Sequence, residues 1–261
     1  MIYPDWNSWT SAGFVVYNLV GIPLLFVRQG LGWNPLNHGF KGHNLSGFSV
    51  PARVGWFLGY FSALVAMWLT SLDCELAMLP LQARLAAYTV WGHWIKRTLE
   101  VLLVHRYSSR VDIDFIMNVS MYASSVAWFQ MTVVCKHSDE IQRHNQAAFW
   151  LGMGIYLIGI VVNGYHHILL ARMRPSSQTN KEMPYRQPQG GLFGYWISPH
   201  YIAELGIFLG WAFMLNHLSM WLVLLVTTVH LTSLSHARKQ WCMKKMDGFD
   251  SKPAILIPNV W

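Results

Sequence analysis

Long apolar stretches alternate with shorter polar segments along the chain, and this pattern predicts helices that span a membrane. A bilayer core needs about 20 consecutive apolar residues in a helix, so the last two of seven candidate stretches are short. The seven stretches are 11–27, 54–72, 83–104, 115–135, 147–170, 201–215 and 219–234. Residues 216–218 predict a tight turn. We therefore expect an all-α integral membrane protein, with 1–261 forming one membrane domain, a bundle of about seven transmembrane helices.

The composition supports a membrane protein, because 53% of the 261 residues are hydrophobic and only 12% are charged. The net charge of +7 includes no basic run interleaved with aromatic residues, so we expect no nucleic-acid partner. Cys74, Cys135 and Cys242 lie far apart without a CxxC pair, so their spacing does not imply a disulfide framework or a zinc site. No basic region precedes the first apolar stretch, so no cleavable signal is expected.

Positive residues concentrate on one side of the predicted bundle. If the chain crosses the membrane seven times, one side holds fourteen of the 19 Lys and Arg residues. This side consists of the segments 28–53, 105–114 and 171–200 and the chain after 234. The opposite side holds three, and two lie within the third span. Cytoplasmic loops of membrane proteins carry such an excess. We therefore expect this side to face the cytosol or its equivalent, with the N-terminus opposite.

A break between two apolar stretches predicts a capped helix start. Ser198 is a good N-cap residue, and Pro199 suits the first helical position, where its missing N–H costs nothing. His200 and Glu204 then lie one turn apart on one face of the helix. On these features alone, the segment is a turn that joins two membrane helices.

The same break also has the features of an anion site. Arg186 and the flexible pair Gly190 and Gly191 precede the helix start, and a helix N-terminus attracts phosphate groups. The segment is therefore interpreted either as a phosphate or pyrophosphate site or as a capped turn. The basic tail 236–244 likewise has two interpretations, a lid over a phosphate or an anchor at the membrane surface.

The third apolar stretch is the most polar of the seven. His93, Arg97 and Glu100 follow i, i+4, i+7 spacing and share one helix face. Ionisable groups at membrane depth are costly, and they normally face a bundle interior or a water-filled cavity. We expect Arg97 and Glu100 to face inward and to pair with each other or with neighbouring helices. These residues either form an internal ion pair that holds helices together or belong to a functional site.

A second polar stripe ends the fifth stretch. Asn163, His167 and Arg174 recur there at helical spacing. Arg172 and Arg174 are explained equally well as a positive anchor at the cytosolic boundary.

Three blocks of the sequence resemble the steroid 5α-reductase family. The first is Gln-Gly-Gly-Leu-Phe at 189–193, followed by Ser-Pro-His-Tyr-x-x-Glu at 198–204. The second is Pro-Ala-Arg-x-x-Trp-Phe-Leu at 51–58. The third, His-x-x-Lys-Arg-x-Leu-Glu-x-Leu-x-Val-His-Arg-x-Ser at 93–108, looks most like trans-2-enoyl-CoA reductases. The likeness covers about 50–258 and implies a membrane enzyme that uses NADPH to reduce a conjugated carbon–carbon double bond.

The resemblance also implies where NADPH binds. Asn163, His167 and Arg174 are similar to the adenosine-phosphate side of the family's cofactor site. The cofactor-binding residues implied in this chain are Asn163, His167, Arg174, Tyr185, Arg186, Gly190, Gly191, Ser198, His200, Tyr201 and Glu204.

The substrate side departs from the family pattern at two positions. The family's Gln-Glu pair, whose Glu binds the substrate carbonyl, is replaced by Gly59 and Tyr60, and its proton-donating Tyr by Trp94. An indole N–H can hydrogen-bond but is no useful acid, whereas a phenol can donate a proton. Tyr60, His93 and Tyr88 are the local candidates for a replacement acid. The catalytic candidates are therefore Tyr60 and His93, together with Trp94.

Two functions follow from these observations. The first is a reductase of an enoyl-CoA or Δ4-3-keto steroid type of lipid, with Tyr60 or His93 as the acid. The second is a catalytically inactive relative, with or without nucleotide, that serves as a structural subunit of a larger membrane complex such as a respiratory assembly. A di-iron membrane oxidase is disfavoured because the His spacings do not match its clusters. By resemblance the membrane is the endoplasmic reticulum, with the mitochondrial inner membrane as the alternative.

Overall fold

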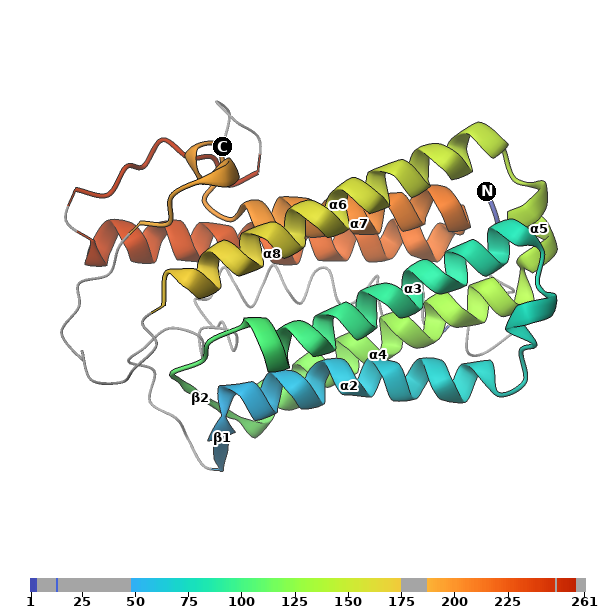
Figure 1. The fold of residues 1–261 in the computed structure, drawn as a ribbon, viewed down its shortest axis with the longest axis horizontal. Coiled ribbons are helices and arrows are strands. Elements are labelled where there is room, and N and C mark those ends of the chain that lie inside the picture. Colours follow the sequence, from blue (N-terminus) through green and yellow to red (C-terminus); the bar gives the residue numbers. More distant parts are fainter. Residues whose placement is uncertain (4–12, 14–47, 175–186, 247, 257–261) are drawn as a thin grey trace.

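The computed structural model describes residues 1–3, 13, 48–174, 187–246 and 248–256 (Figure 1). The first expected span, 11–27, apart from Gly13, and the candidate residues Tyr185 and Arg186 lie outside the described residues. The described residues are mostly helical, as the sequence predicts.

Within the described residues, six long helices form a bundle in two groups that face each other in Figure 1. One group is α2 (Ala52–Ser71), α3 (Leu81–Leu99) and α4 (Ile113–Lys136), and the other is α6 (Gln146–Arg172), α7 (Pro199–Leu215) and α8 (Leu218–Lys245). The shorter elements are β1 (Ser49–Pro51), a 3-10 turn (Leu76–Met78), a π-helical turn (Glu100–Val104), β2 (Arg110–Asp112), α5 (Ser138–Arg143) and a second 3-10 turn (Gly191–Gly194).

The strands β1 and β2 form a small antiparallel pair that the helical pattern did not predict. Ser49 lies opposite Asp112, and Val50 lies opposite Val111. The pair ties the start of α2 to the start of α4, whose first turn is capped by the Asp112 carboxylate through the amide of Phe115. An Asp at this position satisfies a backbone N–H that the helix itself leaves unpaired.

Helix boundaries coincide with residues that favour them. Asn145 caps α6 by accepting from the amides of Ala147 and Ala148, and Pro199 occupies the first turn of α7. Asn216 adopts a left-handed conformation with φ of 44° at the end of α7. This residue makes the predicted tight turn into α8.

Three helices among the described residues, α2, α6 and α8, are long and apolar enough to cross a membrane. The helix α7 has only 17 residues, and the last turn of α3 contains Lys96 and Arg97. The expectation of about seven transmembrane helices therefore stays a prediction. The helix α8 extends to Lys245, beyond the expected end at 234, so the basic segment 236–244 continues the helix.

Glycines allow α6 and α7 to pack at close range. A Cβ atom added to Gly159 would lie 2.9 Å from the carbonyl oxygen of Ala203, and one added to Gly152 would lie 2.6 Å from that of Gly210. Larger side chains at these positions would push the two backbones apart. The close approach brings Asn163, one turn beyond Gly159, against the first turns of α7.

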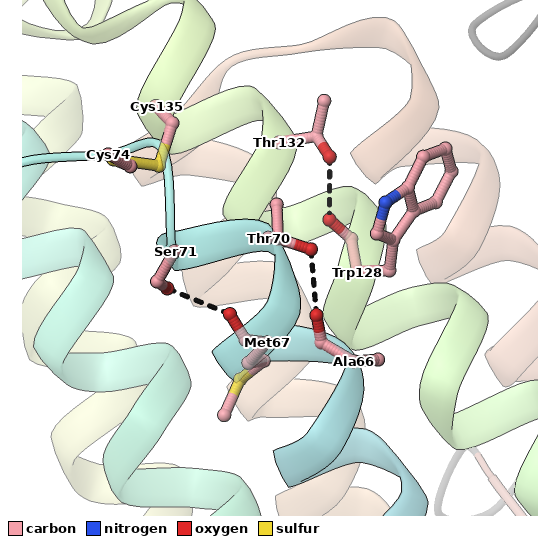
Figure 2. Close-up of a disulfide and its surroundings, with 8 residues drawn as sticks. All are labelled: Ala66, Met67, Thr70, Ser71, Cys74, Trp128, Thr132 and Cys135. Carbon is pink, nitrogen blue, oxygen red and sulfur yellow. Dashed lines mark hydrogen bonds between the residues drawn. A yellow bond between two sulfur atoms is a disulfide. The ribbon is translucent and has the colours of Figure 1, made fainter.

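A disulfide joins Cys74 and Cys135, with their Cα atoms 5.9 Å apart (Figure 2). The spacing of these cysteines did not indicate the disulfide. They are 61 residues apart and match no spacing pattern. The parallel packing of α2 and α4 brings the segment after α2 to the last turn of α4, and this tertiary contact pairs the two thiols.

The ends of the helices are distributed as the charge pattern predicts (Figure 1). The start of α2 and the ends of α6 and α8 lie at one end of the bundle. Ile2 lies at the other end, where its amide donates to the Asn216 carbonyl at 2.7 Å and its carbonyl accepts from Leu218 at 2.9 Å. The described N-terminal residues are thus opposite the Lys- and Arg-rich end.

Candidate functional site

Tyr60 on α2 and Arg97 on α3 form the first contact of the site. The Nη2 atom of Arg97 donates to the Tyr60 hydroxyl oxygen at 2.5 Å. The guanidinium carbon also lies 4.7 Å from the centre of the Tyr60 ring. Since arginine can only donate, the hydroxyl proton of Tyr60 is left for another acceptor.

Glu100 neutralises the buried cations of α3. Its Oε2 atom accepts from Arg97 at 3.1 Å, and its Oε1 atom lies 2.7 Å from Lys96 Nζ. The side chains of Arg97 and Glu100 are 13% and 7% exposed. The prediction that both face inward and pair is therefore confirmed. Lys96 belongs to the same network, although its place in the sequence indicated no role.

Asn163 links the α3 network to α7. Its Oδ1 atom accepts from Lys96 at 2.6 Å. Its Nδ2 atom donates to the His200 carbonyl at 3.0 Å and to Glu204 Oε2 at 2.9 Å. Asn163, His200 and Glu204, predicted from separate segments, are thus brought together at one point between α3, α6 and α7.

His167 lies one turn beyond Asn163 and contacts the same carboxylate. Its Nδ1 atom is 3.0 Å from Glu100 Oε2 and 3.2 Å from Arg97 Nη1. Its ring centre is 5.5 Å from that of His200. The predicted stripe on α6 therefore faces the interior as far as His167.

His93 is fully buried at the centre of the bundle. Its Nε2 atom lies 3.4 Å from Glu204 Oε1, and its ring contacts Trp94 and Trp211 edge-on. Neither ring nitrogen forms a well-aligned hydrogen bond within the described part of the chain. Tyr88, the third candidate acid, is 55% exposed and lies outside this cluster.

Trp94 is buried beside Tyr60, with ring centres 6.4 Å apart. Its indole N–H donates to Gln130 Oε1 on α4 at 3.2 Å. The residue at the position of the family's proton donor is thus engaged with another side chain. Tyr60 offers a phenol whose ring lies next to that position.

The start of α7 has unpaired buried groups. Ser198 occupies the N-cap position as predicted, but its side chain makes no capping bond. The Ser198 hydroxyl and His200 Nδ1 are buried without a partner among the described residues. The Tyr201 ring lies 4.3 Å from that of His200. A polar ligand at this helix N-terminus would satisfy these groups.

Gly190 and Gly191 form the turn that precedes α7, with φ angles of 86° and 52°. A Cβ atom at Gly191 would lie 2.7 Å from His166 Nε2, which accepts from the Leu192 amide at 3.0 Å. The turn therefore needs glycine both for its conformation and for its approach to α6. These glycines and the unpaired groups fit the phosphate-bearing cofactor that the family resemblance implies.

Arg174 follows α6 at the positive end of the bundle. Its guanidinium donates to the Arg106 carbonyl, and Arg106 donates back to the Arg174 carbonyl at 2.9 Å. Burial, and then the nearby Arg238, lower the pKa of Arg174. No acidic side chain of the described residues forms an ion pair with Arg174 or Arg238. Such converging cations favour an anionic ligand.

Glu100, His105 and His167 are close enough to hold a metal ion, with one ligand atom of each within 4.8 Å of the others. Burial, and then the charge of His167, lower the pKa of His105 to about 3. Lys96 and Arg97 already neutralise the Glu100 carboxylate. Two cations at this carboxylate disfavour a further divalent cation.

The fold and the site define a helical membrane protein whose buried polar network meets a glycine turn and a capped helix start. The chain belongs to the 3-oxo-5-alpha-steroid 4-dehydrogenase family, whose model matches residues 111–261. The resemblance inferred from the three sequence blocks is therefore confirmed.

Individual relatives extend this similarity over most of the chain. The chain is 26% identical to 3-oxo-5-alpha-steroid 4-dehydrogenase 1 of Mus musculus, over 82% of this chain and 83% of that protein. It is 27% identical to a very-long-chain enoyl-CoA reductase of Dictyostelium discoideum, over 64% and 54% of the two chains. It is 29% identical to a polyprenal reductase of Danio rerio, over 66% and 58%.

Proposed function

We propose that this protein is an NADPH-dependent reductase of a conjugated carbon–carbon double bond in a lipid. The observation that carries the proposal is the Tyr60 hydroxyl, which accepts from the buried Arg97 and lies beside Trp94. The names of the relatives, which include a steroid dehydrogenase, an enoyl-CoA reductase and a polyprenal reductase, support a lipid with an unsaturated carbonyl group.

Tyr60 is the proposed general acid. NADPH supplies a hydride when bound, and the reduced substrate then needs one proton. The phenol of Tyr60 can give that proton, because its oxygen already accepts from Arg97 and its hydrogen has no acceptor among the described residues. Arg97 stabilises the resulting phenolate through its positive charge. General acid catalysis of this kind contributes about 10²–10⁴-fold to a rate.

The groups proposed to hold NADPH extend from the bundle centre to its positive end. Asn163, His200 and Glu204 form the inner part, and the glycine turn with Ser198 forms the middle. Arg174 supplies charge for the phosphates. The membrane proposed is that of the endoplasmic reticulum, with this end toward the cytosol and membrane lipids around the bundle.

NADPH oxidation by the purified protein tests this function. The substrates are a trans-2-enoyl-CoA, a Δ4-3-keto steroid and a polyprenal. We expect turnover of at least one of them, and Trp94→Tyr, which restores the family residue, should raise it. A protein that binds NADPH but reduces none of the three, and stays silent as Trp94→Tyr, contradicts the proposal. That outcome favours the catalytically inactive subunit of a membrane complex.

A further inference from the structure

Gln130 on α4 is held in one orientation by Trp94. An indole N–H can only donate a hydrogen bond, so the Gln130 atom that faces it at 3.2 Å must be the amide oxygen. The amide nitrogen therefore points away from the indole. This chemistry removes the usual ambiguity between the two ends of a glutamine amide.

The amide nitrogen of Gln130 has no acceptor. Gln130 is fully buried, and its Nε2 atom has no hydrogen-bond partner among the residues that the structure describes. A buried polar group without a partner lowers stability, and such a group in a native protein calls for an explanation such as a ligand. Gln130 thus offers two N–H bonds that the described protein does not use.

Gln130 differs in this respect from three hydroxyl side chains of α4. The hydroxyls of Ser124, Ser125 and Thr132 donate to carbonyl oxygens of their own helix, at 2.6, 3.0 and 2.9 Å. Their hydrogen bonds are satisfied within one turn of α4. The unpaired amide is therefore a feature of one position and not of the helix face as a whole.

Trp94 contacts both Tyr60 and Gln130. The Tyr60 ring lies 6.4 Å from the Trp94 ring, and the Gln130 amide is bonded to the indole nitrogen. Tyr60 lies on α2 and Gln130 on α4, and Gly59 allows these two helices to pack closely. A Cβ atom at Gly59 would lie only 2.5 Å from Val119. A phenol and an unpaired amide thus border the same buried indole.

We propose that the Gln130 amide donates a hydrogen bond to the carbonyl oxygen of the substrate, with Trp94 as the positioning residue. This inference rests on the proposed reductase function. When hydride adds to the β-carbon, the double-bond electron pair moves toward the carbonyl, and its oxygen becomes negative. Gln130 stabilises that oxygen without transferring a proton. Tyr60 gives its proton to the α-carbon, and water returns a proton to the phenolate.

The role assigned to Gln130 explains the substitution at position 94. A tyrosine there would donate to the substrate directly. The tryptophan instead fixes an amide that donates in its place, while the acid is supplied by Tyr60. Donors aimed at a developing oxyanion act chiefly in the transition state, and loss of one lowers kcat by about 10²–10³-fold.

The first test compares Gln130→Leu with the control Thr132→Val on the same helix. Gln130→Leu should lower kcat by about 10²-fold or more with the NADPH dissociation constant within about twofold of wild type. Thr132→Val should leave kcat unchanged. If Gln130→Leu does not fold, Gln130→Glu keeps the acceptor for the indole and should lower kcat at least as much. A kcat within about twofold of wild type in the folded variant overturns the inference.

The second test separates this inference from the proposed function. The infrared carbonyl stretch of a ¹³C-labelled trans-2-enoyl-CoA is measured in complexes with NADP⁺, which cannot transfer hydride. The carbonyl frequency should be lower in the wild type than in Gln130→Leu. Trp94→Phe should shift this frequency toward the value of Gln130→Leu. This result supports Gln130 even if wild type reduces no substrate. If the frequencies are equal and the wild type is active, the role of Gln130 is wrong and the reductase function stands. If the wild type binds none of the three carbonyl substrates, both proposals are wrong.

Discussion

The Arg97 guanidinium donates to the Tyr60 hydroxyl oxygen at 2.5 Å, and it also contacts Glu100. One side chain thereby joins the proposed acid on α2 to the network that reaches α6 and α7. The position of Tyr60 is therefore linked to the residues proposed to bind the cofactor.

Tyr60→Phe should remove catalysis without removing the cofactor. The change keeps the ring against Trp94 but deletes the hydroxyl, so turnover should fall by about 10²–10⁴-fold. The NADPH dissociation constant should stay near that of wild type. Tyr88→Phe is the matched control, because Tyr88 is 55% exposed on α3. If Tyr60→Phe turns over as fast as wild type, another group is the acid.

Arg97→Met should destabilise the protein strongly. Removing one partner of a buried ion pair costs about 3–5 kcal/mol, since the remaining charge stays buried. At about 2–4 °C per kcal/mol, the melting temperature in detergent should fall by roughly 10 °C. Glu140→Gln is the control, because its pair with His137 is at the surface and should change stability by less than about 1 kcal/mol. Equal melting temperatures would refute a structural role for Arg97.

Arg174→Ala should weaken NADPH binding. Loss of a close charged contact costs about 2–5 kcal/mol, so the dissociation constant should rise at least about 30-fold. Arg84→Ala removes a cation at the opposite end, where Arg84 contacts the Ala77 carbonyl, and should have no effect. Isothermal titration or fluorescence titration gives both values. An unchanged constant for Arg174→Ala removes this residue from the cofactor site.

The disulfide predicts which side of the membrane each end faces. Cys74 and Cys135 lie at the end that is poor in Lys and Arg, and disulfides persist in oxidising compartments. In sealed vesicles whose cytosolic face is outward, a membrane-impermeant reductant should leave this disulfide intact until detergent is added. Thiol labelling followed by mass spectrometry reads the result. Reduction in intact vesicles would reverse the proposed orientation.

The sequence predicts helices well and tertiary pairings poorly. The second expected span, 54–72, agrees closely with α2, because apolar periodicity is a local property. The end of α8 was placed eleven residues too early, since basic residues were assigned to a tail although a helix can continue beyond the membrane. The pairing of Cys74 with Cys135 depends on how two helices pack, which local patterns do not encode.

The candidate site was likewise predicted only in part. Asn163 and Glu204 were found because they lie in motifs with recognisable spacing, and the structure brings them together. Gln130 was missed because it is a single amide among small hydroxyl residues, without a partner at helical spacing. Lys96 was present in a recognised block, but its contact with Asn163 joins two helices and is visible only in three dimensions.

His217 should make the stability of the protein depend on pH. Burial, and then the charge of His137, lower the pKa of His217 to about 4. The folded state therefore keeps this imidazole neutral, whereas the unfolded chain binds a proton near pH 6.5. The contribution of His217 to the free energy of unfolding is therefore complete above pH 6.5. As the pH falls toward about 4, up to about 3 kcal/mol of this contribution is lost.

His217→Asn tests this expectation with little change in structure. His217 caps α8 by accepting from the Ser219 amide, and asparagine is a good cap that does not titrate. The two proteins should therefore have similar melting temperatures at pH 7.5. Between pH 6.5 and 4.5, the wild-type melting temperature should fall more steeply than that of the variant, because only the wild type gains a proton here on unfolding. Parallel curves for the two proteins would show that His217 stays charged in the folded state or is too exposed to contribute.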